Sequence, residues 1–523
     1  MRRLVKVAAV SALAVVGLSA CVGGSVGGTV SGLVGSGLVL QINGGDDLAI
    51  SANGSFTFDT KLASGSSYAV TVKTQPTSPS QTCTVDNGSG TVGFKAITNV
   101  SVTCRTLVGK FLYVPNTGSN DVSAYSIDAT TGALTTVSGA PFAAGNSPLE
   151  VTRDPSGRFL YVVNKGAATD PSISEYTIDS SSGALTRVAG SPLALDPSGT
   201  YQLSLLSLIS FAPSGKFAYL SGSGPGGLVE FELALDTASG SLTAIPGSPV
   251  LVTSAPSTVP PGTFDATGTH FYQPFGYTEG SIAIYDADSA SGVLTPGSTA
   301  SVPNGGDNPF IATKHPSGKY LYVPNLASGT IATYAIDANT GYLTAVAGSP
   351  FSTGGTFPVY AVTHPSGKFV FVANGNSLPG TGAIATLAAF AVDTTTGTLS
   401  AINGSPFSTH GTNALLDPSV CHIDVLGKFI YVNNSASNTI AGFSIDQTTG
   451  ALADIPGSPF ATGAMPSVPI LDPSGQYLYV VNRGANSISS YAIDSTSGAL
   501  TLVNTVPTGT SPGTVELGVV GLQ

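Results

Sequence analysis

One apolar pattern recurs along most of this chain, and Ser317–Asn325 (SGKYLYVPN) shows it clearly. Aromatic and β-branched residues follow a Ser-Gly turn, which is typical of a buried strand entered from a tight turn. The repeat glycines lie near 50 residues apart, a period that indicates a solenoid, a propeller or an array. The eight copies begin at Gly109, Ser156, Ser214, Thr267, Ser317, Ser366, Leu426 and Ser474.

Each copy is followed by three further strand-like runs. The first alternates, as in Ile488–Ile493 (ISSYAI), and ends at an Asp-x-x-x-Gly segment such as Asp494–Gly498. Asp starts a turn through its own backbone and Gly supplies positive φ, so this segment predicts a hairpin. A short third strand and a fourth strand opening near a proline complete the period. Four antiparallel strands in each period of about 50 residues predict the blade of a β-propeller.

The repeat count predicts an all-β fold with a ring of eight blades over residues 107–523. The first copy starts in the middle of a blade, and a lone fourth strand remains near Pro512–Val520. Pairing that last strand with the first three closes the ring and leaves no open edge. Seven blades stay open as the alternative.

The first 20 residues have the features of a secretory signal. Arg2, Arg3 and Lys6 precede an apolar run from Val7 to Leu18 that is too short to span a bilayer. Leu18-Ser19-Ala20-Cys21 resembles the bacterial lipobox, which implies cleavage before Cys21 and a lipid, such as palmitate, on this cysteine. The resemblance implies a lipid-anchored envelope protein, with Val22 favouring the outer membrane on its periplasmic or surface side; an ordinary signal with a chance cysteine is the alternative. Residues 21–37 are rich in Gly and Ser and predict a flexible tether.

Residues 38–106 predict a small β-sandwich, immunoglobulin-like in outline. Five short strand-like runs with turn signals between them fill this segment. Cys83 and Cys104 lie on or at the end of two of these strands. Export permits a disulfide, and a loop of this length should stabilise the fold by roughly 3 kcal/mol. The segment resembles modules that precede propellers in bacterial lipoproteins, so we expect a spacer.

Composition excludes one class of partner. Only 9% of the residues are charged, and the formal net charge is −11. Nucleic-acid binding needs clustered Lys and Arg, so no nucleic-acid partner is expected.

Candidate chemistry lies on the fourth strand of each period, taken as the strand that lines the channel. Aligned on the Pro-Ser-Gly turn, one face of these strands is the better channel candidate, because its non-apolar residues are polar and small. Glu150, His422 and Glu516 stand out on it as general acid/base candidates. The alternative is that they are isolated polar groups in a wet channel. Cys421 beside His422 offers too few ligands for a metal, so neither a metal nor a cofactor is expected.

The SGK(F/Y)LYVxN strands, the ISxYxID strands and the TGxLTxxxGSPF segments resemble the lactonase family, which includes 6-phosphogluconolactonases and muconate cycloisomerases. The resemblance covers roughly Gly109–Gln523 and implies seven blades. A phosphorylated lactone needs a cation clamp, and only Arg153, Lys314 and Arg483 lie near suitable positions. We therefore expect a binding scaffold of the cell envelope, with an envelope protein, a glycan or a small lactone as partner. A lactone hydrolase or cycloisomerase is the alternative.

Overall fold

The computed structural model describes residues 23–76, 81–93, 95–107, 109–166, 170–255, 257–375, 385–411, 421–513 and 518–522. The chain divides into two compact units between Thr106 and Leu107. In the described residues every regular element is a strand, and these residues contain no helix suited to crossing a bilayer. The predicted signal segment 1–20 and the predicted lipidation site Cys21 lie outside the described residues.

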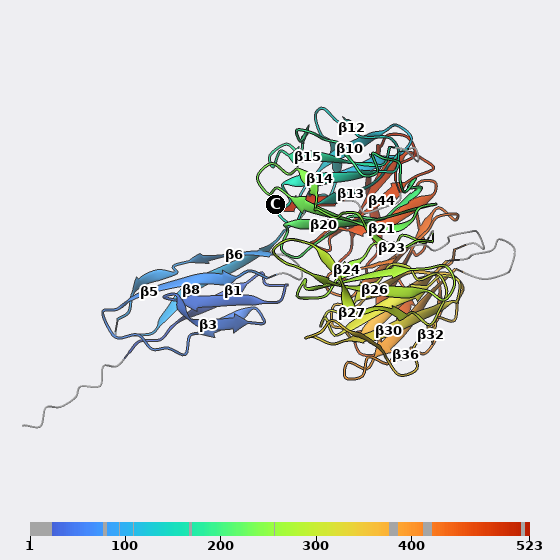
Figure 1. Ribbon diagram of the computed structural model, residues 1–523. Helices are drawn as coiled ribbons and strands as arrows, with labels where there is room; N and C mark the ends of the chain where they lie inside the picture. Colours follow the sequence, from blue (N-terminus) through green and yellow to red (C-terminus); the bar gives the residue numbers. More distant parts are fainter. Residues whose placement is uncertain are drawn as a thin grey trace, which may run out of the picture. The chain divides into compact units, whose positions relative to one another are not determined.

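The first unit is a sandwich of two four-stranded sheets around one apolar core (Figure 1). One sheet has the order β4 (Gly54–Thr57), β1 (Val26–Ser31), β8 (Ile97–Thr106) and β6 (Gln81–Asp86). The other has the order β3 (Gly45–Ile50), β2 (Leu38–Ile42), β5 (Ser67–Thr74) and β7 (Ser89–Thr91).

The disulfide between Cys83 and Cys104 is present, as predicted. The two residues face each other in register on the neighbouring strands β6 and β8, with their Cα atoms 3.9 Å apart. The bond therefore joins two strands of one sheet, whereas the immunoglobulin disulfide connects two sheets.

The prediction of a flexible tether over residues 21–37 is wrong where the structure describes this segment. Residues 26–31 form β1, which pairs with β4 and, in parallel, with β8. Val26 and Val30 are buried in the core. A Cβ on Gly28 would lie 1.7 Å from the carbonyl oxygen of Val100. The glycines in this segment allow two strands to approach closely. Composition alone cannot distinguish this role from that of a flexible tether.

The second unit is the predicted β-propeller, and its described residues form eight sheets, numbered here from 1 to 8 (Figure 1). Sheet 1 contains β47 (Gly518–Leu522), β9 (Gly109–Asn116), β10 (Asp121–Ile127) and β11 (Leu134–Thr136); sheet 2 contains β13 (Pro148–Arg153), β14 (Phe159–Asn164), β15 (Ser172–Ile178) and β16 (Leu185–Arg187). Sheet 3 contains β18 (Leu205–Leu206), β19 (Ser210–Phe211), β20 (Phe217–Gly224), β21 (Gly227–Leu235) and β22 (Leu242–Ala244); sheet 4 contains β24 (Thr263–Phe264), β25 (His270–Phe275), β26 (Ser281–Ala287) and β27 (Leu294–Pro303).

The remaining sheets repeat this order. Sheet 5 contains β28 (Thr313–Lys314), β29 (Tyr320–Asn325), β30 (Thr330–Ile336) and β31 (Leu343–Ala345); sheet 6 contains β33 (Pro358–Thr363), β34 (Phe369–Asn374), β35 (Thr386–Val392) and β36 (Leu399–Ala401). Sheet 7 contains β38 (Cys421–Ile423), β39 (Phe429–Asn434), β40 (Thr439–Ile445) and β41 (Leu452–Asp454); sheet 8 contains β43 (Pro466–Leu471), β44 (Tyr477–Asn482), β45 (Ser487–Ile493) and β46 (Leu500–Pro507). Short strands extend six outer edges: β12 (Phe142–Ala143), β17 (Leu193–Ala194), β23 (Val250–Thr253), β32 (Phe351–Ser352), β37 (Phe407–Ser408) and β42 (Phe460–Ala461).

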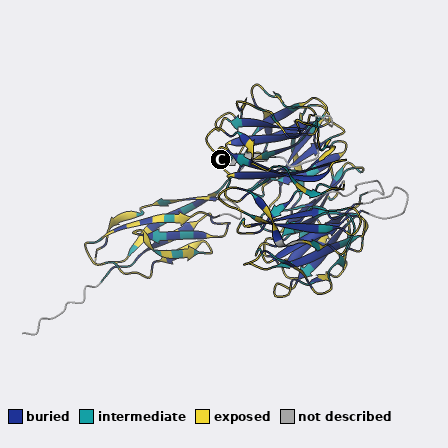
Figure 2. Ribbon diagram, viewed as in Figure 1, coloured by how far each residue is buried: buried dark blue, intermediate teal, exposed yellow. Residues whose placement is uncertain are grey.

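The ring is closed by its last strand and by the packing between sheets. β47 pairs with β9, so sheet 1 combines the C-terminal strand with the first strands of the unit. An apolar cluster fills each seam, meaning the contact between two consecutive sheets, and one of these clusters joins sheet 8 to sheet 1. Figure 2 shows the same distribution, with buried strand interiors and exposed loops. The core of the propeller is therefore distributed over its seams.

The repeat residues Tyr and Gly bond neighbouring sheets together. In sheet 2, the Tyr161 hydroxyl donates to the carbonyl oxygen of Gly240, the glycine of the Asp-x-x-x-Gly turn in sheet 3, at 2.8 Å. The same bond is made by Tyr113, Tyr219, Tyr272 and Tyr431 to Gly183, Gly292, Gly341 and Gly498. The repeat therefore specifies hydrogen bonds between neighbouring sheets in addition to the strands themselves.

Candidate functional site

The inner strands face the axis of the ring. They stand at the edge of each sheet opposite the exposed outer strands, and β28, β33, β38 and β43 contact one another in succession. Alternate residues on them, such as Ser210, Thr263, Thr313 and Val362, keep intermediate exposure, whereas Ala312 and Ala361 between them are buried. The fourth strand of each sequence period is thus the inner strand, and the predicted face is the more accessible one, although Glu150 on it is buried.

Glu150 lies on β13 in sheet 2 and is fully buried. Its Oε2 accepts a hydrogen bond from the backbone N–H of Ile209 at 3.2 Å. Ile209 lies between β18 and β19, where the inner strand of sheet 3 is interrupted. The Glu150 carboxyl group thus supports the backbone of a neighbouring sheet.

His422 lies on β38 in sheet 7, and its ring stacks on the ring of Tyr360 from β33 in sheet 6. The two ring centroids are 6.1 Å apart and the planes meet at 15°. Both residues keep intermediate exposure. His422 nevertheless lies well below the outer surface, so burial lowers its pKa to about 4. The imidazole is therefore neutral at pH 7, and the pair forms a flat, uncharged surface on the inner wall.

The three predicted acid/base residues are not brought together in the described part of the chain. Two sheets, 8 and 1, lie between Glu150 in sheet 2 and His422 in sheet 7. Glu516 lies outside the described residues. On the described part of the last strand, Gly518 takes the position that His422 has in sheet 7, because Gly518 pairs with Tyr113 and His422 pairs with the equivalent Tyr431.

The three candidate cations do not form a clamp for a phosphate group. Arg153 is exposed. The Lys314 Nζ donates to the backbone carbonyl of Asp265 at 3.4 Å, and the Arg483 Nε donates to that of Pro512 at 3.2 Å. Burial lowers the pKa of Lys314, and Asp265 opposes this shift.

His315 and His364 lie in turns, and each also bonds to the next sheet. The backbone N–H of Ser317 donates to Nδ1 of His315 at 3.1 Å, so the proton is on Nε2. That nitrogen then donates to the carbonyl oxygen of Gly367 in the next sheet at 2.7 Å. His364 makes the equivalent pair of bonds with Ser366 and Gly427.

Cys421 is fully buried in the seam between sheets 6 and 7. Burial raises the pKa of its thiol to about 12. The thiol is therefore a packing group rather than a nucleophile.

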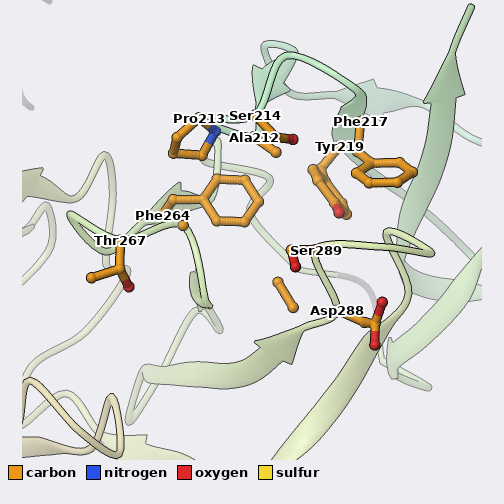
Figure 3. A pocket seen from close by; sticks show the side chains of 11 residues that line it. Ala212, Pro213, Ser214, Phe217, Tyr219, Phe264, Thr267, Asp288 and Ser289 are labelled. Atoms are coloured by element: carbon orange, nitrogen blue, oxygen red, sulfur yellow. The ribbon is translucent and has the colours of Figure 1, made fainter.

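A small hollow lies in the seam between sheets 3 and 4, away from both Glu150 and His422. Figure 3 shows the rings of Phe217, Tyr219 and Phe264 around it, with Asp288 beside them. Its volume of about 50 Å³ is well below the roughly 300–1,000 Å³ of ligand sites. The hollow is a packing defect in one seam.

Sequence reasoning did not single out Tyr360 as a site residue. The available signal was an aromatic residue at a position where the other inner strands carry glutamate, proline or an aliphatic residue.

Several solved structures resemble this chain in fold, and two of them illustrate the likeness. The periplasmic gluconolactonase of Pseudomonas aeruginosa matches with a TM-score of 0.53 at 18% identity, over 80% of this chain and 100% of that one. A protein of Bacteroides uniformis named as a candidate 6-phosphogluconolactonase matches with a TM-score of 0.51 at 17% identity, over 79% and 99%. No curated protein matches the sequence.

The family model described as "Lactonase, 7-bladed beta-propeller" matches residues 73–201, 192–359, 281–413, 361–468 and 460–518. Its description names seven blades, the alternative that the sequence left open, whereas the described residues of this ring form eight sheets. The matched segments together span most of the chain, and the chain therefore belongs to the lactonase family of β-propellers.

Proposed function

We propose that this protein binds a small uncharged ligand of the lactone or sugar class on the inner wall of its ring. The observation that carries the proposal is the stacked pair of His422 and Tyr360. Small-molecule sites consist mainly of apolar and aromatic surface with a few polar groups. The pair supplies the aromatic surface. The hydroxyl of Thr313, which donates to the carbonyl oxygen of Ala361, can accept from a ligand, and Thr263 on the next inner strand adds a second hydroxyl group.

The ligand we propose carries no phosphate. His422 is neutral at pH 7 because its pKa is about 4, and Lys314 and Arg483 donate to backbone carbonyl oxygens. A phosphate group would lack the charge-assisted bonds that normally hold it.

We further propose that the protein acts in the bacterial cell envelope, anchored through a lipid on Cys21. The basic start, the apolar run and Leu18–Cys21 support this location. The disulfide in the first unit fits an oxidising compartment, and a protein of similar fold is periplasmic.

Lactone hydrolysis is the second candidate, and family membership favours it. The described geometry favours binding alone. A histidine with a pKa near 4 is a weak general base at neutral pH, and Glu150 is engaged with the backbone of Ile209.

The test uses the full-length protein in detergent and a panel of uncharged sugar and acyl lactones. Calorimetry would measure binding, and a coupled pH assay would measure turnover. We expect Tyr360→Ala and His422→Ala to weaken binding at least tenfold, while Thr152→Val on the opposite wall changes it less than twofold. Equal affinity in all variants would refute the proposed site. Turnover that is lost in Glu150→Gln while binding persists would move the protein into the hydrolase class.

A further inference from the structure

The seam between sheets 3 and 4 departs from the repeat at two buried positions. Glu230 on β21 faces Ser221 on β20. The seven equivalent positions in the other sheets are all aliphatic: Val122, Ile173, Ile282, Ile331, Leu387, Ile440 and Ile488. Across the seam, Gln273 on β25 occupies a position that is otherwise valine or leucine. Two polar side chains thus enter the same apolar seam from opposite sides.

These two side chains meet at one hydroxyl group. The Ser221 Oγ lies 2.6 Å from Oε2 of Glu230 and 2.9 Å from Oε1 of Gln273. The Gln273 amide orientation is fixed because its Nε2 donates to the carbonyl oxygens of Pro260 and Pro274 at 2.8 and 2.9 Å. A flipped amide would bring its oxygen against both carbonyls.

A proton count then decides the state of Glu230. A serine hydroxyl has one hydrogen to donate, but it faces two oxygen atoms. If Glu230 were ionised, one of its two contacts would be between acceptors. If Glu230 carries a proton, its O–H donates to Ser221 and Ser221 donates to Gln273. Only the protonated carboxyl group completes the chain of hydrogen bonds.

The surroundings also disfavour a negative charge. Glu230 is 1% exposed, and its Oε1 has no hydrogen-bond partner among the described residues. The ionisable groups that face it are Glu232 on the same strand, Tyr219 on β20 and Tyr285 on β26, and none of them is a cation. Burial raises the pKa of Glu230 to about 8, Glu232 adds to this shift, and the bond from Ser221 opposes it.

We propose that Glu230 keeps its proton at neutral pH and that loss of this proton loosens the seam between sheets 3 and 4. We call the bonded set of Glu230, Ser221 and Gln273 the latch. Deprotonation leaves a charge in an apolar seam and breaks the bond between Ser221 and Gln273. Gln273 also holds the backbone at Pro260, which leads into the inner strand β24. The latch therefore connects the seam to the inner wall.

The sign of the pH effect follows from the direction of the shift. The native carboxyl group binds its proton more tightly than the unfolded one, whose pKa is near 4.3. Its contribution to stability is complete below that value and is lost as the pH rises to about 8. Across this window the unfolding constant should rise about tenfold per pH unit relative to a variant that cannot ionise.

The decisive experiment compares the full-length protein with Glu230→Gln by denaturant unfolding from pH 5 to 9. The glutamine can donate to Ser221 and cannot lose a proton. We expect the unfolding constant of the wild type, relative to the variant, to rise steeply up to about pH 8 and then level off. Parallel profiles would overturn the proposal.

Two further variants keep the test decisive. Glu232→Gln removes a neighbouring carboxylate that accepts from the backbone of Leu294, and it should keep the steep wild-type profile. If Glu230→Gln does not fold, Glu230→Ile with Gln273→Val restores the residue types of the other sheets and should abolish the steep profile. Persistence of the steep profile in that double variant would refute the latch.

Hydrogen exchange tests the location of the effect. After correction for intrinsic rates, amides of β21 and β25 should exchange faster at pH 8.5 than at pH 6 in the wild type and equally in Glu230→Gln. Equal protection of these strands at both pH values in the wild type would overturn the claim that the seam loosens.

Discussion

Two neighbouring seams of the ring lie between sheets 2 and 3 and between sheets 3 and 4. They are joined by equivalent hydrogen bonds but are packed with different side chains. In both, a tyrosine hydroxyl donates to a turn glycine at 2.8 Å: Tyr161 to Gly240, and Tyr219 to Gly292. In both, a glutamate accepts from a backbone N–H of the next sheet: Glu175 from Leu242, and Glu232 from Leu294.

The filling of the two seams is different. The first is packed by a large aliphatic and aromatic cluster. The second contains a smaller cluster, the hollow beside Phe217, and the bonded set Glu230, Ser221 and Gln273. The repeat therefore fixes how sheets are bonded together, while residues outside the repeat pattern set how tightly each seam is filled.

The largest loss of stability should come from replacing equivalent turn glycines in the two seams by alanine. Gly240 and Gly292 have φ of +82° and +76°, and an added Cβ would lie 2.2 Å from Phe159 and 2.3 Å from Phe217. Strained backbone costs about 1–2 kcal/mol and overpacking about 1–3 kcal/mol. We expect Gly240→Ala to lower the free energy of unfolding by about 3 kcal/mol, measured by chemical denaturation. Gly292→Ala should cost about 2 kcal/mol, because Phe217 can move into the hollow.

Gly190 provides the matched control for crowding. Its φ is +89° and no atom lies within 4 Å of an added Cβ. Gly190→Ala should therefore cost only the backbone term of about 1 kcal/mol. Equal losses at Gly240 and Gly292 would show that the hollow does not soften the second seam.

A smaller effect is expected from removing the shared glutamates. Glu175→Ala leaves the buried N–H of Leu242 without its acceptor, and Glu232→Ala does the same to Leu294. An unsatisfied buried donor costs about 1–3 kcal/mol, so we expect about 2 kcal/mol for each variant in thermal unfolding. A loss in only one seam would contradict the idea that these bonds are equivalent.

The smallest effect concerns single hydroxyl groups. Tyr161→Phe and Tyr219→Phe should each cost about 1 kcal/mol, because each removes one hydrogen bond. The hydroxyl of Tyr322 is buried without a partner among the described residues, so Tyr322→Phe should be neutral or slightly stabilising. Denaturant midpoints of the three variants, measured together, would check this order.

Much of the fold could be predicted because each copy of the repeat has the same strand pattern and the same turn residues. Alternating aromatic and β-branched residues predicted the strands, and Asp-x-x-x-Gly predicted the hairpins. In the structure the N–H of Gly132 donates to the carbonyl oxygen of Asp128 at 2.8 Å. The glycines of β1 were misread, because a close approach to β8 and a flexible tether have the same composition.

The candidate site was predicted only in part. The alternating inner face was identified correctly, and His422 lies on it. The stacking of Tyr360 on His422 was missed, because these residues are 62 positions apart in the sequence and on different sheets.

The sequence by itself determined the strand order of each sheet and the closure of the ring by a C-terminal strand, because these depend on local periodicity and turn chemistry. Only the tertiary structure decided which side chains face each other across a seam. That is why the separation of Glu150 from His422, the pairing of His422 with Tyr360, and the contact of Glu230 with Gln273 became visible only there. Contacts across a seam depend on the angle and register between two sheets, which no local pattern specifies.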